Sequence, residues 1–171
     1  MLSTLLGLNL AAYGQPLDVF DASRAGDVAA LEAAYAENPE SINDQDYMGY
    51  SPLILAVYND QPEAVAFLLS HGARVDTQDR SGNTALMGAI FKGYDTQVQR
   101  LLEAGADPNQ QNYNLATALT FACTFGGAEM VSQLLAAGAD PHIEDSRGMT
   151  PLDHARMQGN TEVLEILKEA K

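Results

Sequence analysis

Histidine and cysteine are the residue types that most often bind metals or act as nucleophiles, and this chain holds few of either. Its histidines are His71, His142 and His154, and Cys123 is its single cysteine. The histidines stand far apart, and none has a cysteine or carboxylate at the spacing of a metal site. No histidine stands where it would activate Cys123 as a nucleophile. We therefore expect turn or surface histidines, no metal, and a cysteine that serves in packing.

Aspartates are concentrated in short polar segments, which raises the question of calcium. They are Asp44, Asp46, Asp76, Asp79, Asp107, Asp140 and Asp145. Calcium loops place Asp or Asn at alternate positions before a glycine and end on a distal Glu, a pattern that is missing here. Aspartates are common in turns because their side chains bond to nearby backbone. Phosphate-binding glycine loops and the nucleophile elbow are missing too, so we expect no cofactor and no enzymatic activity.

The overall composition excludes further classes of function. The chain has 171 residues, about one domain's worth, with 9 Lys and Arg against 23 Asp and Glu and a net charge of −14. An acidic surface of this size repels phosphate, so we expect no nucleic-acid partner. No apolar run approaches the roughly 18 residues of a membrane span, and one cysteine cannot form an intramolecular disulfide. Hydrophobic residues make up 46% of the sequence, which is typical of a folded chain.

The same residue types recur every 33 residues from about residue 17 onward. Four columns keep this step: a Ser/Thr-x-Leu tripeptide, a central alanine, a Gly-Ala pair and a leucine. Their members are Ser51-Pro52-Leu53, Thr84-Ala85-Leu86, Thr117-Ala118-Leu119 and Thr150-Pro151-Leu152; Ala56, Ala89, Ala122 and Ala155; Gly72-Ala73, Gly105-Ala106 and Gly138-Ala139; and Leu68, Leu101, Leu134 and Leu167. Several independent columns in phase indicate an internal repeat.

Each unit predicts a turn followed by two short helices. Glycines such as Gly82 stand in polar tips, where they allow a positive φ, and the Ser or Thr of the tripeptide can cap the first helix. The second helix carries apolar residues at i, i+3 and i+4, as in Val65, Leu68 and Leu69. It ends at a glycine such as Gly72. One helix pair cannot bury its own apolar face, so neighbouring units must stack into one continuous, elongated core.

The 33-residue step, the T-P-L tripeptide, the central alanine and the Gly-Ala-Asp turn resemble the ankyrin repeat family. Close matches are residues 150–155 (TPLDHA) and 101–109 (LLEAGADPN). The resemblance covers about nine-tenths of the chain. It implies an all-α ankyrin-repeat solenoid of stacked helix-turn-helix units with projecting β-turn or hairpin tips. It divides residues 17–171 into five repeats, of which the first and last resemble capping repeats: about 17–47, 48–80, 81–113, 114–146 and 147–171.

Two departures from the family pattern concern the turns. The histidine that usually follows T-P-L and bonds between neighbouring turns is absent, so we expect weaker contacts there. In its place stand Ile54, Met87, Thr120 and Asp153. Leu115 stands where the other tips have glycine, and a leucine at positive φ is costly. Either Asn114 takes the left-handed conformation or this tip has a different shape, as a rearranged turn or as an apolar contact surface.

Residues 1–14 read MLSTLLGLNLAAYG and need a separate interpretation. A leucine-rich run ends in the small residues Ala11 and Ala12, which resembles the apolar region and cleavage site of a secretory signal. No Lys or Arg precedes the run, which departs from such signals. Residues 1–16 are therefore either the remainder of a signal, in an exported (periplasmic or secreted) protein, or a capping helix, in a cytoplasmic one.

The resemblance implies a concave groove in which the tips and the exposed side of each first helix contact a partner. Carried over column by column, the candidate contact residues are rich in aromatic and apolar side chains: Tyr47, Met48, Tyr50, Tyr58, Arg80, Phe91, Lys92, Tyr113, Phe125, Arg147, Met149 and Met157. Interface centres favour Tyr, Phe and Met, which a solvated face does not need. The alternative is that rings such as Phe91 and Phe125 pack between the helices.

We therefore expect a non-enzymatic module that binds a partner protein through this groove. The net charge of −14 favours a partner with basic as well as apolar contact residues. We expect the chain itself to be a monomer. The other interpretations are an accessory or inhibitory subunit that neutralises an enzyme or toxin, a structural spacer, and an enzyme whose site the sequence does not reveal.

Overall fold

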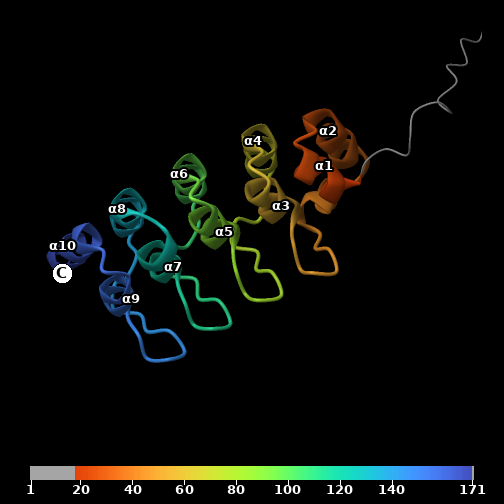
Figure 1. Cartoon of the computed structure of the whole chain (residues 1–171). Coiled ribbons are helices and arrows are strands. Elements are labelled where there is room, and N and C mark those ends of the chain that lie inside the picture. Colours follow the sequence, from red (N-terminus) through yellow and green to blue (C-terminus); the bar gives the residue numbers. More distant parts are fainter. Residues whose placement is uncertain (1–17, 171) are drawn as a thin grey trace, which may run out of the picture.

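The structure is a computed structural model and describes residues 18–170. Residues 1–16, interpreted above as a signal remainder or a capping helix, lie outside the described residues. The described chain is an all-helical solenoid without strands, in which helix pairs follow one another in a row (Figure 1). This confirms the fold class that the repeat predicts.

Every repeat contributes one inner and one outer helix. The inner helices are α1 (Val19–Ala25), α3 (Pro52–Tyr58), α5 (Ala85–Lys92), α7 (Ala118–Phe125) and α9 (Pro151–Gln158). The outer helices are α2 (Val28–Glu37), α4 (Pro62–Ser70), α6 (Asp95–Glu103), α8 (Ala128–Ala136) and α10 (Thr161–Glu169), and a 3-10 helix, η2 (Pro39–Asn43), follows α2. Each inner helix packs on its own outer helix, and neighbouring inner helices pack on one another.

Four loops project from the same side of the row of inner helices (Figure 1). We call their ends finger 1 (residues 44–50), finger 2 (77–83), finger 3 (110–116) and finger 4 (143–149). The surface formed by the fingers and the exposed sides of the inner helices is called the inner face below. The surface formed by the outer helices is called the outer face.

A hydroxyl caps the start of four inner helices, as the tripeptide predicts. The Ile54 N–H donates to Ser51 Oγ (3.2 Å), and Thr84, Thr117 and Thr150 accept in the same way in the next three repeats. In α7 and α9 the bond is reciprocal, because Thr120 and Asp153 accept from the backbone N–H of the capping threonine. These two residues, which stand where the family has histidine, therefore fix the start of their own helices.

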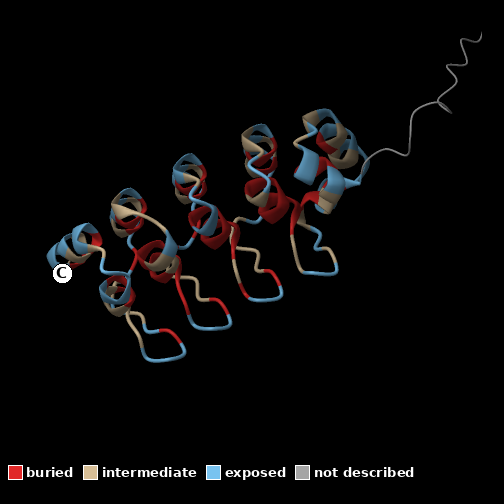
Figure 2. Cartoon of the chain, in the orientation of Figure 1, coloured by how far each residue is buried: buried red, intermediate tan, exposed pale blue. Residues whose placement is uncertain are grey.

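One continuous core runs through the repeats from Val19 to Leu167 (Figure 2). The inner helices hold most of it: residues 85–90 of α5 are all buried. The outer helices bury only one side, as in α4, where Ala64, Val65 and Leu68 are buried. The stacking of neighbouring repeats thus buries what a single helix pair would leave in water.

The fingers are tied to one another by repeated hydrogen bonds. A backbone bond links each finger to the next, from the N–H groups of Arg80, Tyr113 and Ser146 to the carbonyls of Met48, Ser81 and Asn114 (3.1, 3.1 and 2.8 Å). A ladder of glutamines adds a second link, because the Nε2 groups of Gln45, Gln78 and Gln111 donate to the carbonyls of Gln78, Gln111 and Glu144. Backbone and glutamine groups therefore link the fingers without the missing histidine, and the expectation of weaker contacts stays a prediction.

Finger 3 keeps the shape of its neighbours even though it carries Leu115 instead of glycine. Asn112 Oδ1 accepts from the N–H groups of Asn114 and Ala116 (2.9 and 3.0 Å), as the aspartate of finger 2 accepts from its own finger. Leu115 itself adopts the left-handed conformation, with φ of 58°. Both sequence alternatives are therefore wrong: Asn114 does not take the positive φ, and the finger is not reshaped. Instead, the half-exposed Leu115 adopts the strained backbone conformation.

Replacing Leu115 with glycine should therefore stabilise the protein. Relief of the left-handed strain should raise the free energy of unfolding by about 1 kcal/mol, because the leucine side chain is 48% exposed and contributes little burial. Equilibrium urea unfolding measures the change. Asn114→Gly, at the neighbouring position without a positive φ, serves as the control and should not stabilise. A Leu115→Gly variant no more stable than the wild type would contradict the assignment of strain to this residue.

Candidate binding surface

The large exposed hydrophobic side chains of the described residues all lie on one side of the solenoid. Seven such side chains are more than a third exposed, and every one belongs to a finger or to an inner helix. They are Tyr47, Met48, Phe91, Tyr113, Leu115, Phe125 and Met157. Six of them are among the predicted contact residues, and only Leu115 is added. The described outer helices expose no large hydrophobic side chain to this extent.

Three other predicted contact residues are less accessible. Tyr50, Tyr58 and Met149 are only partly exposed, and the Tyr50 and Tyr58 rings lie 6.2 Å apart. Tyr58 covers Gly88 of the next inner helix so closely that a Cβ at Gly88 would lie 2.6 Å from its ring. Burial raises the pKa of the Tyr58 hydroxyl, and the nearby charge of Asp79 adds to this. Tyr58 is thus a packing residue between α3 and α5 that offers a partner only part of its ring.

The contact between Tyr58 and Gly88 can be tested by a pair of substitutions. Alanine is favoured over glycine in a helix by about 1 kcal/mol, so Gly88→Ala should stabilise a Tyr58→Ala background by about that amount. In the wild type the new methyl meets the ring, and the same change should cost about 1 kcal/mol. Thermal or urea unfolding of the four proteins gives the coupling. An equal effect of Gly88→Ala in both backgrounds would show that the ring does not occupy this space.

The phenylalanines of α5 and α7 form a small aromatic cluster on the inner face. The rings of Phe91 and Phe125 meet edge to face at 5.3 Å, and Phe121 lies 5.9 Å from Phe125. Phe91 and Phe125 nevertheless keep 51% and 55% of their surface exposed. They therefore pack on each other across adjacent repeats, as one interpretation of the sequence predicts. They are not covered, so they are also accessible, as the other interpretation requires.

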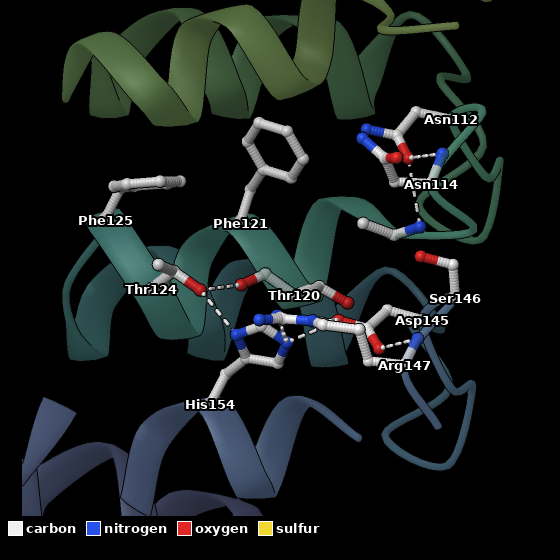
Figure 3. A pocket seen from close by; sticks show the side chains of 11 residues that line it. Asn112, Asn114, Thr120, Phe121, Thr124, Phe125, Asp145, Ser146, Arg147 and His154 are labelled. Carbon is white, nitrogen blue, oxygen red and sulfur yellow. Dashed lines mark hydrogen bonds and ion pairs between the residues drawn. The ribbon is translucent and has the colours of Figure 1, made fainter. Parts of the chain in front are cut away.

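A pocket opens beside this cluster, between α7, α9 and fingers 3 and 4 (Figure 3). We call it the α7–α9 pocket; its volume is about 350 Å³. Phe121 and Phe125 form its apolar side, and the polar groups come from the two fingers and α9. Its lining is Asn112, Asn114, Ala116, Thr120, Phe121, Thr124, Phe125, Asp145, Ser146, Arg147 and His154. Of the predicted contact residues, it brings together Phe125 and Arg147.

A buried polar network forms the floor of this pocket. Asp145 and His154 are each 7% exposed, and His154 Nε2 lies 2.9 Å from Asp145 Oδ2 (Figure 3). The Arg147 guanidinium donates to the same oxygen through Nη2 (3.0 Å) and Nε (3.3 Å). Burial alone would raise the pKa of Asp145, but hydrogen bonds from His154, Arg147 and the finger backbone outweigh it and hold that pKa well below its usual range. Asp145 is therefore a buried carboxylate with a full set of donors.

Family models of ankyrin repeats match this chain over residues 19–112, as "Ankyrin repeats (3 copies)", and over residues 101–155, as "Ankyrin repeats (many copies)". The first match alone spans more than half of the 171 residues. The chain belongs to the ankyrin repeat family. No curated protein matches it in a sequence search. Ankyrin repeats are generally protein–protein interaction modules, and ankyrin repeat proteins are typically non-enzymatic.

Charge is divided unevenly between the helices of this ankyrin repeat protein. The five outer helices hold nine Asp and Glu against two Lys and Arg. The five inner helices hold two Asp and Glu against three Lys and Arg. The inner face also carries the exposed predicted residues Arg80 and Arg147 on its fingers and Lys92 at the end of α5, where Lys92 Nζ lies 5.7 Å from the centre of the Tyr58 ring. The negative charge of the helices thus belongs mainly to the outer face.

The structure contradicts the prediction for one histidine and confirms the prediction for the cysteine. His154 is buried in the floor of the pocket, so its interpretation as a turn or surface residue is wrong. The exposed His71 stacks on Phe67 of the outer helix α4, at 4.0 Å between ring centres. Cys123 is 3% exposed, and burial raises its pKa to about 12, so it is a packing residue as expected.

Over residues 18–170, no group of three or more His, Cys, Asp or Glu side chains is arranged to hold a metal ion. None of the helices in that part of the chain combines the length and the apolar character needed to cross a membrane.

The low pKa of Asp145 makes a prediction about stability and pH. A carboxyl whose pKa is lowered by folding adds stability above its ordinary pKa, near 3.9, and loses it as the pH falls through the folded value. Asp145→Asn should therefore lower the free energy of unfolding by about 2 kcal/mol at pH 7. The loss is limited to this size because the amide can still accept from the finger backbone, as Asn112 does. The difference from the wild type should shrink as the pH falls below about 4.

Urea unfolding across this pH range measures the effect, with Asp44→Asn at an exposed finger position as the control. If the stability difference caused by Asp145→Asn were the same at pH 7 and at pH 3, the network would not depend on the carboxylate charge.

Proposed function

We propose that this ankyrin repeat protein binds a partner protein through its inner face. The observation that carries the proposal is the segregation of all seven exposed large hydrophobic side chains of the described residues onto the fingers and inner helices. Aromatic and methionine side chains are favoured at the centres of interfaces, where they supply most of the binding energy. A structural spacer would not need such residues on one face.

The form of the inner face supports recognition without a large conformational change. Backbone and glutamine bonds link each finger to the next, so the contact side chains stand on a braced surface. Pre-organised surfaces bind with small backbone shifts and a lower entropic cost. The Phe91–Phe125 pair lies centrally along the row of inner helices and would act as the main apolar anchor.

The charge distribution indicates which kinds of residue the partner should carry. The net charge of −14 gives long-range attraction to a partner that carries basic residues. On the inner face the contacts that we propose are chiefly apolar, with the exposed cations Arg80, Lys92 and Arg147 beside them.

Removing the two exposed rings tests the proposal. Phe91→Ala combined with Phe125→Ala should weaken the complex about 30-fold or more, the effect of losing a binding hot spot. Tyr58 is left intact, because its ring packs on Gly88 and its loss would disturb the fold. The partner is captured from extracts of the native host with the wild type, identified, and titrated against each variant by calorimetry.

Phe67→Ala on the outer helix α4 is the matched control, because it also removes a ring from an aromatic cluster but on the outer face. It should leave the affinity unchanged. A partner that is lost with Phe67→Ala and retained by the Phe91/Phe125 variant would move the binding surface to the outer helices and contradict the proposal.

A further inference from the structure

The α7–α9 pocket places one exposed cation over a buried carboxylate. Asp145 is the only acidic side chain of the lining; it is 7% exposed, and its Oδ2 lies within hydrogen-bond distance of His154 Nε2 (2.9 Å) and Arg147 Nη2 (3.0 Å). His154 is held on its other side, where Nδ1 lies 3.1 Å from the Thr124 hydroxyl. The Arg147 side chain, in contrast, is 59% exposed, so the charge that the pocket presents to solvent is positive.

No other acidic side chain belongs to the lining. Finger 3 and α7 contribute Asn112, Asn114, two threonines and two phenylalanines, all uncharged. Glu144 belongs to finger 4 but lies outside the lining, and Asp153 of α9 is paired with Arg156 (3.2 Å). The exposed guanidinium of Arg147 is therefore the charged group that a ligand would meet in this pocket.

Arg147 is placed to bind an anion. Its side chain is 59% exposed, and its contacts with Asp145 use Nε and Nη2. Among the described residues, no hydrogen bond uses Arg147 Nη1, so its N–H groups remain available to a ligand. Asn114 and Ser146, both exposed, add an amide and a hydroxyl to the same lining. A guanidinium with neighbouring neutral donors matches the geometry of a carboxylate.

The opposite side of the pocket requires an apolar group next to the anion. Phe121 and Phe125 line it, and Phe125 is 55% exposed. The volume of about 350 Å³ is at the small end of ligand pockets and cannot admit a helix about 10 Å across. It suits one or two side chains of an extended segment, one charged and one apolar.

We infer that the α7–α9 pocket binds an acidic side chain, Asp or Glu, from an extended segment of the partner protein, with an adjacent aromatic or aliphatic side chain against Phe121 and Phe125. The inference rests on the proposed function and adds to it the partner chemistry at this site. The carboxylate pairs with Arg147, while Asp145, itself bonded to His154, holds the guanidinium in place from below.

Peptide selection on the intact protein tests this inference. Random peptides displayed inside a carrier protein, so that no chain terminus is offered, are selected on the wild type. The enriched sequences should share an Asp or Glu next to an aromatic or aliphatic residue. In a selected peptide with both ends capped, changing that acid to its amide should weaken binding at least 10-fold.

Variants of the protein then locate the contact. Arg147→Gln should also weaken binding at least 10-fold, and its effect should largely disappear with the amide peptide, because both changes remove the same bond. Arg147→Lys keeps the charge and should restore part of the affinity, which a purely structural role would not predict. Arg156→Gln removes an arginine that also pairs with an aspartate but lies outside the pocket lining, and it should have no effect.

Several results would overturn the inference. They are enrichment of basic peptides, no enrichment at all, equal binding of acid and amide peptides, or an unchanged affinity with Arg147→Gln. Peptides that lose binding to the Phe91/Phe125 variant but ignore Arg147 would leave the proposed function standing and refute the carboxylate site. Binding that requires a free peptide carboxyl terminus would also refute it, since the site would then take a chain end.

Discussion

Burial of one helix pair against the next is the constraint on which the rest of this structure depends. A pair of short helices has an apolar side that only a neighbouring pair can cover, so each repeat must present the same surface to the same partner surface. The 33-residue step satisfies this requirement and aligns every inner helix, outer helix and finger in rows. The inner helix α5, which has a repeat on either side, is buried along residues 85–90. The binding surface that we propose follows from the same alignment, because the alignment brings one residue from each repeat into a common row.

The fingers solve a second problem, the satisfaction of polar groups that stacking buries. Asp79, Asn112 and Asp145 each accept two backbone N–H groups of their own finger, so each closes five residues into a fixed turn. Links between fingers then brace these turns into a row. In finger 4 the second carboxylate oxygen of Asp145 remains available, and His154 and Arg147 occupy it. A structural aspartate thereby fixes the cation that faces the pocket.

Much of this architecture can be predicted from the sequence, because periodicity reports on packing. The columns of Ala56 and Leu68 predicted the buried side of each helix, and Thr84 and its equivalents predicted the caps. Contacts between residues that hold different positions in the repeat could not be predicted, because the period does not say which of them meet. The repeat pattern places Tyr58 in the groove, but it does not indicate that its ring fills the space over Gly88, a residue of the next repeat. Likewise, the burial of His154 depends on Asp145, which stands nine residues earlier and in a finger.

The central claim is that the inner face is the surface that meets the partner. Hydrogen–deuterium exchange of the protein alone and in complex tests it most directly, because backbone amides report on every repeat at once. The account predicts slower exchange on binding in fingers 1 to 4 and at the ends of α5, α7 and α9, with exchange in α6, α8 and α10 unchanged. Protection confined to the outer helices would contradict it.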